Sequence, residues 1–128
     1  MPIRILVTFV LTTLLSVAPA NAEPRGQWRE LPPIPSKRTE VAVAYLDGKV
    51  YVVGGFTQKG ITRHVDVWDP KSGEWSSIAP LPRPLHHTTA SAVDGKLYVI
   101  GGFATGMWNP VNTTYEYDPG RHTWNEKA

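Results

Sequence analysis

Hydrophobic and polar residues alternate in short runs bounded by glycine, proline and aspartate, a pattern typical of β-strands joined by turns. In residues 64–69, Val65 and Val67 fall on one face of an extended chain, and Asp66 and Trp68 fall on the other. Beyond the first 22 residues no segment has the sustained period of a helix. The pattern predicts four strands in the first part of the chain, at 40–46, 49–54, 64–69 and 74–78.

The same pattern then occurs a second time. YLDGKVYVVGGF at 45–56 matches AVDGKLYVIGGF at 92–103, at a spacing of 47 residues. VDVWDPKSGEW at 65–75 matches TYEYDPGRHTW at 114–124 at a spacing of 49, so the second copy contains two extra residues in between. Such a repeat indicates a supersecondary unit that stacks on its own copies. The second copy predicts strands at 88–93, 96–101, 113–118 and 123–127.

Turn residues separate the predicted strands. Asp47-Gly48 and Asp94-Gly95 are two-residue hairpin signals, because Asp-Gly accepts the positive φ values of a type I′ turn. Residues 69–73 predict a second kind of turn, in which Pro70 fixes φ and Gly73 is free to become left-handed. The paired glycines that follow the second and sixth predicted strands suit a strand end where a side chain would obstruct close backbone packing.

The repeat resembles the kelch family of β-propellers, over residues 27–128. The resemblance implies an all-β, kelch-type β-propeller fold with about two four-stranded blades, at 40–78 and 88–127, and an N-terminal outer strand at 27–31. Repeated apolar positions in such folds usually form the core between blades, so we expect a structural role for them, with ligand binding by the tryptophans as the alternative. The residues that carry the resemblance are Gly54, Gly55, Gly101, Gly102, Tyr51, Tyr98, Trp28, Trp75 and Trp124.

The number of blades is small for a propeller, which typically closes with four to eight. We therefore expect a fragment or truncated product of a longer propeller, in which the strand at 27–31 would complete a last blade that is absent. Assembly of several copies into a ring and a poorly folded isolated stub are the alternatives. Two blades alone leave strand edges and blade faces open, so we expect self-association through them.

Residues 1–22 have the layout of a secretory signal peptide: a basic start at Arg4, an apolar run from Ile5 to Val17, and a small-residue end at Ala20-Asn21-Ala22. The apolar run is too short to span a ~30 Å hydrocarbon core comfortably. We expect cleavage that leaves 23–128 as an exported, bacterial-type protein, secreted or periplasmic, with no stable membrane insertion. An uncleaved membrane anchor is the alternative.

Composition excludes several kinds of chemistry. The formal net charge is only +2, which gives no electrostatic reason to expect a nucleic-acid partner. The chain contains no Cys, so disulfides, thiolate metal sites and a Cys nucleophile are excluded. A copper-dependent galactose oxidase is a kelch relative whose site needs a Cys, so we expect no cofactor. No nucleophile elbow, zinc-protease motif or phosphate-binding glycine loop occurs in the sequence, and any catalytic residues are unknown.

The connections predict two different faces of the propeller. Tight turns at 47–48, 69–73, 94–95 and 118–121 share one face, and longer connections at 31–39, 56–63, 79–87 and 103–113 share the other. Binding residues concentrate on loops held by a rigid scaffold, so we expect the second face to bind. It also carries Lys37, Glu40, His64 and His87. The candidate binding residues are Arg38, Arg63, Arg83, His86, Met107 and Trp108, with capping or solvated surface roles as the alternative.

Two of these candidates prompt a specific expectation. Arg38 and His86 lie near the start of innermost strands, where they could face the channel and bind carboxylates or carbohydrate. His86 and His87 are adjacent in a predicted strand, so their side chains should point to opposite faces, and we expect no metal site.

The function that fits these observations is a non-catalytic binding module that recognises an as yet unknown protein or carbohydrate through the loop face. The alternative is part of a sugar-acid-modifying enzyme, similar to a kelch-type sialic-acid epimerase, with its site in the propeller channel.

Overall fold

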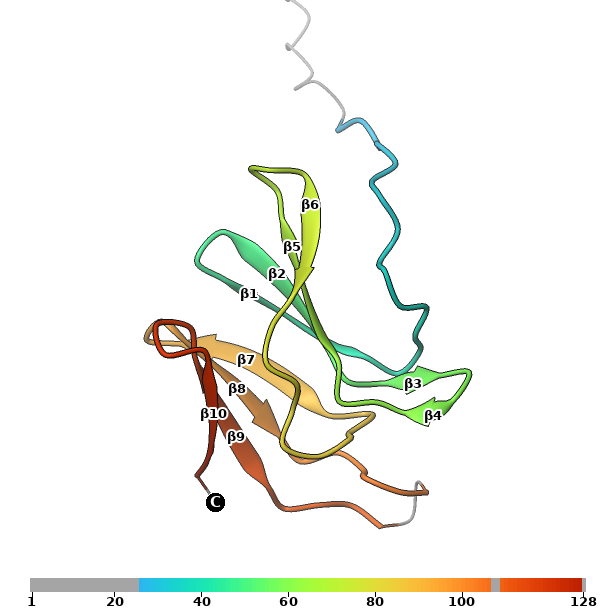
Figure 1. Cartoon of the computed structure of the whole chain (residues 1–128), viewed down its shortest axis with the longest axis vertical. Helices are drawn as coiled ribbons and strands as arrows, with labels where there is room; N and C mark the ends of the chain where they lie inside the picture. Colours follow the sequence, from blue (N-terminus) through green and yellow to red (C-terminus); the bar gives the residue numbers. More distant parts are fainter. Residues whose placement is uncertain (1–25, 107–108, 128) are drawn as a thin grey trace, which may run out of the picture.

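The computed structural model describes residues 26–106 and 109–127, and all the regular structure in these ranges is β-strand. The strands form two four-stranded antiparallel sheets that lie face to face (Figure 1). The predicted all-β fold with two four-stranded blades is thereby confirmed. The first blade has the order β1 (Ala42–Leu46), β2 (Lys49–Val53), β5 (Val65–Asp69) and β6 (Glu74–Ser77); the second has β7 (Thr89–Val93), β8 (Lys96–Ile100), β9 (Thr114–Asp118) and β10 (Thr123–Glu126).

The first blade carries an additional hairpin that the sequence pattern did not predict. β3 (Phe56–Thr57) pairs with β4 (Gly60–Ile61) inside the connection between β2 and β5. Strands of two residues are too short to show an alternation of hydrophobic and polar positions, so the segment resembled an ordinary long connection. In Figure 1 this hairpin projects from the first blade at the end opposite the tight turns.

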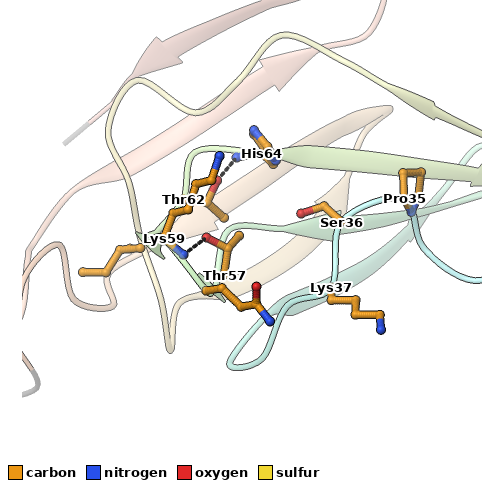
Figure 2. A pocket seen from close by; sticks show the side chains of 9 residues that line it. Pro35, Ser36, Lys37, Thr57, Lys59, Thr62 and His64 are labelled. Atoms are coloured by element: carbon orange, nitrogen blue, oxygen red, sulfur yellow. Dashed lines mark hydrogen bonds between the residues drawn. The ribbon is translucent and has the colours of Figure 1, made fainter.

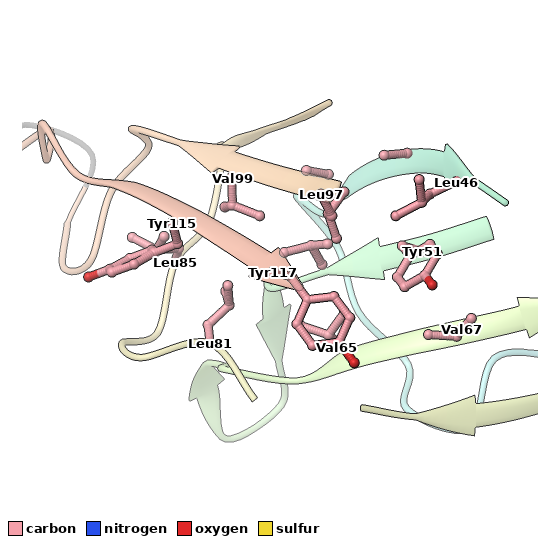
Figure 3. Close-up of a cluster of buried hydrophobic side chains, with 13 residues drawn as sticks. Leu46, Tyr51, Val65, Val67, Leu81, Leu85, Leu97, Val99, Tyr115 and Tyr117 are labelled. Atoms are coloured by element: carbon pink, nitrogen blue, oxygen red, sulfur yellow. The ribbon is translucent and has the colours of Figure 1, made fainter. Parts of the chain in front are cut away.

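The hydrophobic core lies between the two blades. Side chains from β1, β2 and β5 meet side chains from β8 and β9, and Leu81 and Leu85 of the connection between blades close the cluster (Figure 3). β1 lies against β7 at the inner edge, where small residues such as Ala42 and Ala44 allow close approach. Interdigitated packing of this kind is the largest stabilising contribution in a repeat architecture.

The paired glycines end β2 and β8 as the sequence predicted. Gly54 and Gly55 both have positive φ, at 62° and 95°, and Gly101 and Gly102 repeat these values closely, at 60° and 93°. The N–H of Gly55 donates to the carbonyl of Leu85 at 2.8 Å, so the connection to the second blade rests on the end of β2. A Cβ atom on Gly54 would collide with that same carbonyl group. These glycines therefore allow the blades to pack.

Two tryptophans have equivalent structural roles in the two blades. The indole N–H of Trp75 donates to the carbonyl of Pro32 at 2.9 Å, and that of Trp124 donates to the carbonyl of Ala79 at 2.8 Å. Pro32 and Ala79 are 47 residues apart and thus occupy equivalent positions. Each outermost strand is fastened in this way to the segment that enters its blade.

The expected strand at 27–31 is absent from the structure, which differs here from the prediction. Residues 26–34 contain no strand, and the Trp28 side chain is fully exposed. A fourth blade strand needs the third strand of its own blade as a partner. The segment of the chain that the structure describes contains no such third strand before β1. The segment instead runs alongside the first blade, where Pro32 accepts the hydrogen bond from Trp75.

Both outward blade faces expose large apolar side chains. Val43 and Tyr45 of β1 are 54% and 67% exposed, and Val93 and Ile100 of the second blade are 52% and 47% exposed. Self-association through such faces stays a prediction. No helix in the described residues is long and apolar enough to cross a membrane. The predicted signal peptide at 1–22 lies outside the described residues.

Candidate functional site

A hollow of about 710 Å³ opens on the long-connection face, meaning the face formed by connections 31–39, 56–63, 79–87 and 103–113. Its walls are the segment 35–37, which leads into the first blade, and the β3–β4 hairpin with the residues that follow it (Figure 2). The segment and the hairpin approach the hollow from opposite sides. The residues that line it are Pro35, Ser36, Lys37, Thr57, Gln58, Lys59, Ile61, Thr62 and His64.

Backbone hydrogen bonds hold the two walls together. Thr39 and Phe56 exchange a pair of N–H to carbonyl bonds, at 3.0 and 2.8 Å, and so tie the entering segment to β3. The hydroxyl of Thr57 donates to the carbonyl of Gly60 at 3.1 Å and accepts the N–H of Lys59 at 3.1 Å, which closes the hairpin turn. The hydroxyl of Thr62 accepts the N–H of His64 at 3.2 Å. The shape of the hollow is therefore fixed by the fold.

The lining of the hollow is basic. Lys37, Lys59 and His64 are exposed residues of its lining, and none of the nine lining residues is acidic. Among the described residues neither lysine forms an ion pair. Two ammonium groups without a local counter-charge create a positive potential in a concave site, which attracts anionic groups. None of the lining residues is Phe, Tyr or Trp.

Arg38, the neighbour of Lys37, has contacts of a different kind. Its side chain is fully buried, and its guanidinium donates to the carboxylate of Asp66 at 2.5 Å and to the carbonyls of Gly54 and His64 at 3.1 and 2.9 Å. Burial lowers the pKa of Arg38, and the charge of Asp66 partly opposes that shift. Asp66 also accepts a hydrogen bond from Ser77 at 2.7 Å. These contacts join the entering segment to the ends of β2 and β5 and leave the guanidinium little to offer a ligand.

The second blade replaces this polar pair with apolar residues. Leu85 occupies the position of Arg38, at the spacing of 47, and Tyr115 occupies the position of Asp66, at the spacing of 49. Both are buried in the core cluster. The fold thus accepts either a buried ion pair or an apolar pair at these positions, which is consistent with a structural role for Arg38.

His86 and His87 lie in contact with each other, which corrects the expectation that they point to opposite faces. Their Nδ1 atoms are 2.7 Å apart, because His87 has a positive φ of 47° and the extended alternation is broken there. His86 is fully buried against Phe56 and Phe103, and its Nε2 lies 2.8 Å from the carbonyl of Thr105. A carbonyl only accepts, so this Nε2 carries the proton. Both ring nitrogens of His86 are thus engaged internally.

The remaining candidates do not gather at one point. Arg63 is exposed and donates through Nε to the carbonyl of Leu81, and Arg83 is half-buried in the connection between blades. Met107 and Trp108 lie outside the described residues. Within the described part of the chain there is no group of three or more His, Cys, Asp or Glu residues that could hold a metal ion.

Neither lysine of the hollow was predicted from the sequence as a binding residue. Lys37 was placed on the long-connection face without being a candidate, and Lys59 was not considered. Comparison of the two repeats could have marked both. Lys37 corresponds to Pro84, and the connection 103–113, which is the counterpart of the segment with Lys59, contains no lysine or arginine, so the second blade does without either charge. Residues that one copy of a repeat can omit are not required by the fold they share.

The kelch motif family matches residues 37–82 and 84–128, one match for each blade. Together the two matches cover more than half of the chain, and the protein belongs to the kelch-repeat family. It is also similar to an F-box/kelch-repeat protein of Arabidopsis thaliana, at 41% identity over 49 residues. That alignment covers 36% of this chain and 14% of the plant protein, so the chain spans only a small part of the length of this relative.

Proposed function

We propose that the protein is a protein-interaction module that binds its partner through the long-connection face, with the hollow between residues 35–37 and the β3–β4 hairpin as the centre of the contact. The observation that carries this proposal is the hollow itself, a concave site whose walls are held by backbone hydrogen bonds and whose two lysines form no ion pair with any described residue. Kelch repeats in general serve as interaction modules, which supports the same function.

A selection of peptides from a displayed library tests the proposal. Peptides selected on the purified chain should lose binding to the Gln58→Trp variant, because the indole would occupy the hollow. They should still bind the Ser72→Trp variant, which places the same side chain in the tight turn between β5 and β6, at the opposite end of the blade. Selected peptides that bind both variants equally, or failure to select any peptide, would contradict the proposed function.

We further propose that the protein acts after export, secreted or in a periplasm, with residues 1–22 as its signal peptide. The layout of a basic start, an apolar run and a small-residue end supports this proposal. Expression of the full chain in a bacterium followed by mass spectrometry of each cell fraction tests it. The expected result is a chain that starts at Glu23 outside the cytoplasm. A full-length chain that stays inside would contradict it.

A further inference from the structure

The charges of the hollow point to the chemistry of its ligand. Lys37 and Lys59 each carry an ammonium group, and His64 lies beside Thr62, on the wall formed by the hairpin and the residues that follow it (Figure 2). The two threonine hydroxyls in the wall already make hydrogen bonds within the protein. The groups left to meet a ligand are therefore mainly donors and cations, and carboxylates are the protein groups that such donors bind best.

The surroundings of the hollow do not neutralise these charges. The buried carboxylate of Asp66, two residues after His64, accepts hydrogen bonds from Arg38 and from Ser77. Glu40 lies against the Nε2 of His87. Both carboxylates near the start of the first blade are thus engaged elsewhere, and the lysines lack a partner among the described residues.

The composition of the walls separates two kinds of anionic ligand. Sugar rings pack their apolar C–H faces against the large flat rings of Trp, Tyr and Phe, and none of these three residue types is among the nine lining residues. Pro35 and Ile61 offer small apolar surfaces that suit the methylene groups of an amino-acid side chain. The wall is also part of a hairpin with an extended backbone, a surface that accepts an extended peptide readily.

Resting on the proposed function, we infer that the hollow binds an acidic segment of a partner protein, with Lys37 and Lys59 each pairing with one of its carboxylates. The first blade alone has this specificity, because Pro84 stands at the position equivalent to Lys37 and the connection 103–113 of the second blade contains no lysine or arginine. The entering segment supplies one lysine and the hairpin the other, so binding depends on how the fold holds the two walls together.

The experiment measures binding of fluorescein-labelled hexaglutamate to the full chain by fluorescence anisotropy. The variant Lys37→Gln/Lys59→Gln should weaken binding at least tenfold, since each charge-assisted contact contributes strongly in a concave site. The matched control Lys71→Gln/Arg121→Gln also removes two positive charges, but from the tight turns 69–73 and 118–121. It should change the affinity less than twofold. Equal losses in the two variants would show general electrostatic attraction and overturn the inference.

Two further probes separate this inference from the proposed function. Hexaglutamine should not bind, whereas galacturonic-acid hexamers, which carry carboxylates on a sugar scaffold, should bind at least tenfold more weakly than hexaglutamate. Preferred binding of the sugar acid would overturn the peptide as occupant. If library peptides are blocked by Gln58→Trp and yet are not acidic, the inference fails while the proposed function stands. If Gln58→Trp blocks nothing, the proposed function fails.

Discussion

Glu40 and His87 occupy equivalent positions in consecutive repeats and lie in contact across the two blades. Both have a left-handed backbone, with φ of 56° and 47°. The N–H of His87 donates to the carbonyl of Glu40 at 3.2 Å, and its Nε2 lies 2.5 Å from the Glu40 carboxylate. Through its other ring nitrogen His87 reaches the buried His86. The starts of the two innermost strands are thus joined by a chain of polar contacts.

This chain predicts that His87→Ala destabilises the protein. The substitution leaves Nδ1 of His86 buried without a partner, and an unsatisfied buried polar atom costs about 1–3 kcal/mol. The control Glu40→Gln keeps an oxygen that can accept from His87, so its cost should be about 1 kcal/mol or less. Urea denaturation of both variants measures the free energy of unfolding. Costs of equal size would indicate that His86 does not depend on His87.

The buried pair of Arg38 and Asp66 gives a second prediction. Arg38→Ala should lower the free energy of unfolding by about 3–5 kcal/mol, because it leaves the Asp66 carboxylate buried without its cation. The double variant Arg38→Leu/Asp66→Tyr copies the pair found in the second blade, Leu85 and Tyr115. We expect it to recover most of that loss, to within about 1 kcal/mol of the wild type.

Thermal and urea unfolding measure the wild type, Arg38→Ala, the double variant and its two single variants, Arg38→Leu and Asp66→Tyr, and additivity is the decisive comparison. If the double variant is as unstable as the sum of Arg38→Leu and Asp66→Tyr, the two repeats do not have interchangeable pairs. Recovery of stability in the double variant would also show that Arg38 has a structural role, unlike the lysines of the hollow.

The paired glycines give a third prediction, on two positions that share a positive φ. Gly54→Ala should cost about 3 kcal/mol, because the new Cβ collides with the backbone of Leu85 in addition to the strain of a left-handed residue. Gly60→Ala meets nothing within 4 Å and should cost about 1–2 kcal/mol from φ alone. Denaturant midpoints compare the two variants directly. A Gly60→Ala variant that is the less stable of the two would contradict the packing role of Gly54.

Three hydrogen-bonded carboxylates give a fourth prediction, on stability in acid. Hydrogen bonds from Lys96, Lys49 and Tyr98 lower the pKa values of Asp118, Asp69 and Glu116 respectively. A carboxyl whose pKa is lowered by folding stabilises the protein above its unfolded pKa and loses that contribution as the pH falls through the folded value. The free energy of unfolding should therefore decline from about pH 4.5 downward.

Denaturation at pH 5 and pH 3 measures this decline, with Asp118→Asn as the control. The asparagine cannot titrate, so the variant should lose less stability than the wild type over the same interval. If the two proteins lose stability equally, the contacts of Asp118 do not contribute to the acid dependence.

The repeat made most of the fold predictable. The Asp-Gly turns, the glycine pairs and the alternation around Val65 and Val67 are local signals, and each occurs twice in the sequence. The strand at 27–31 was expected from the match of Trp28 with Trp75 and Trp124, and such a match cannot show whether a partner strand exists. The β3–β4 hairpin was too short to leave a periodic signal.

The candidate site was less predictable, because side-chain environment is a property of tertiary structure. Arg38 and Lys37 are neighbours in the sequence, and both looked like loop cations, yet one is fully buried and the other is exposed. The left-handed backbone at His87 brings its ring to His86. Nothing in the sequence predicts this backbone conformation, because His87 is not a glycine. The difference between the repeats at Lys37 and Lys59 was the one usable clue.

The central claim, that the basic hollow is the binding site, is tested most directly by NMR on ¹⁵N-labelled protein titrated with hexaglutamate. We predict amide shift changes concentrated at residues 36–37 and 57–64, with little change in the tight turns 47–48, 69–73, 94–95 and 118–121. Shift changes that spread evenly over both faces, or that centre on the tight turns, would contradict it.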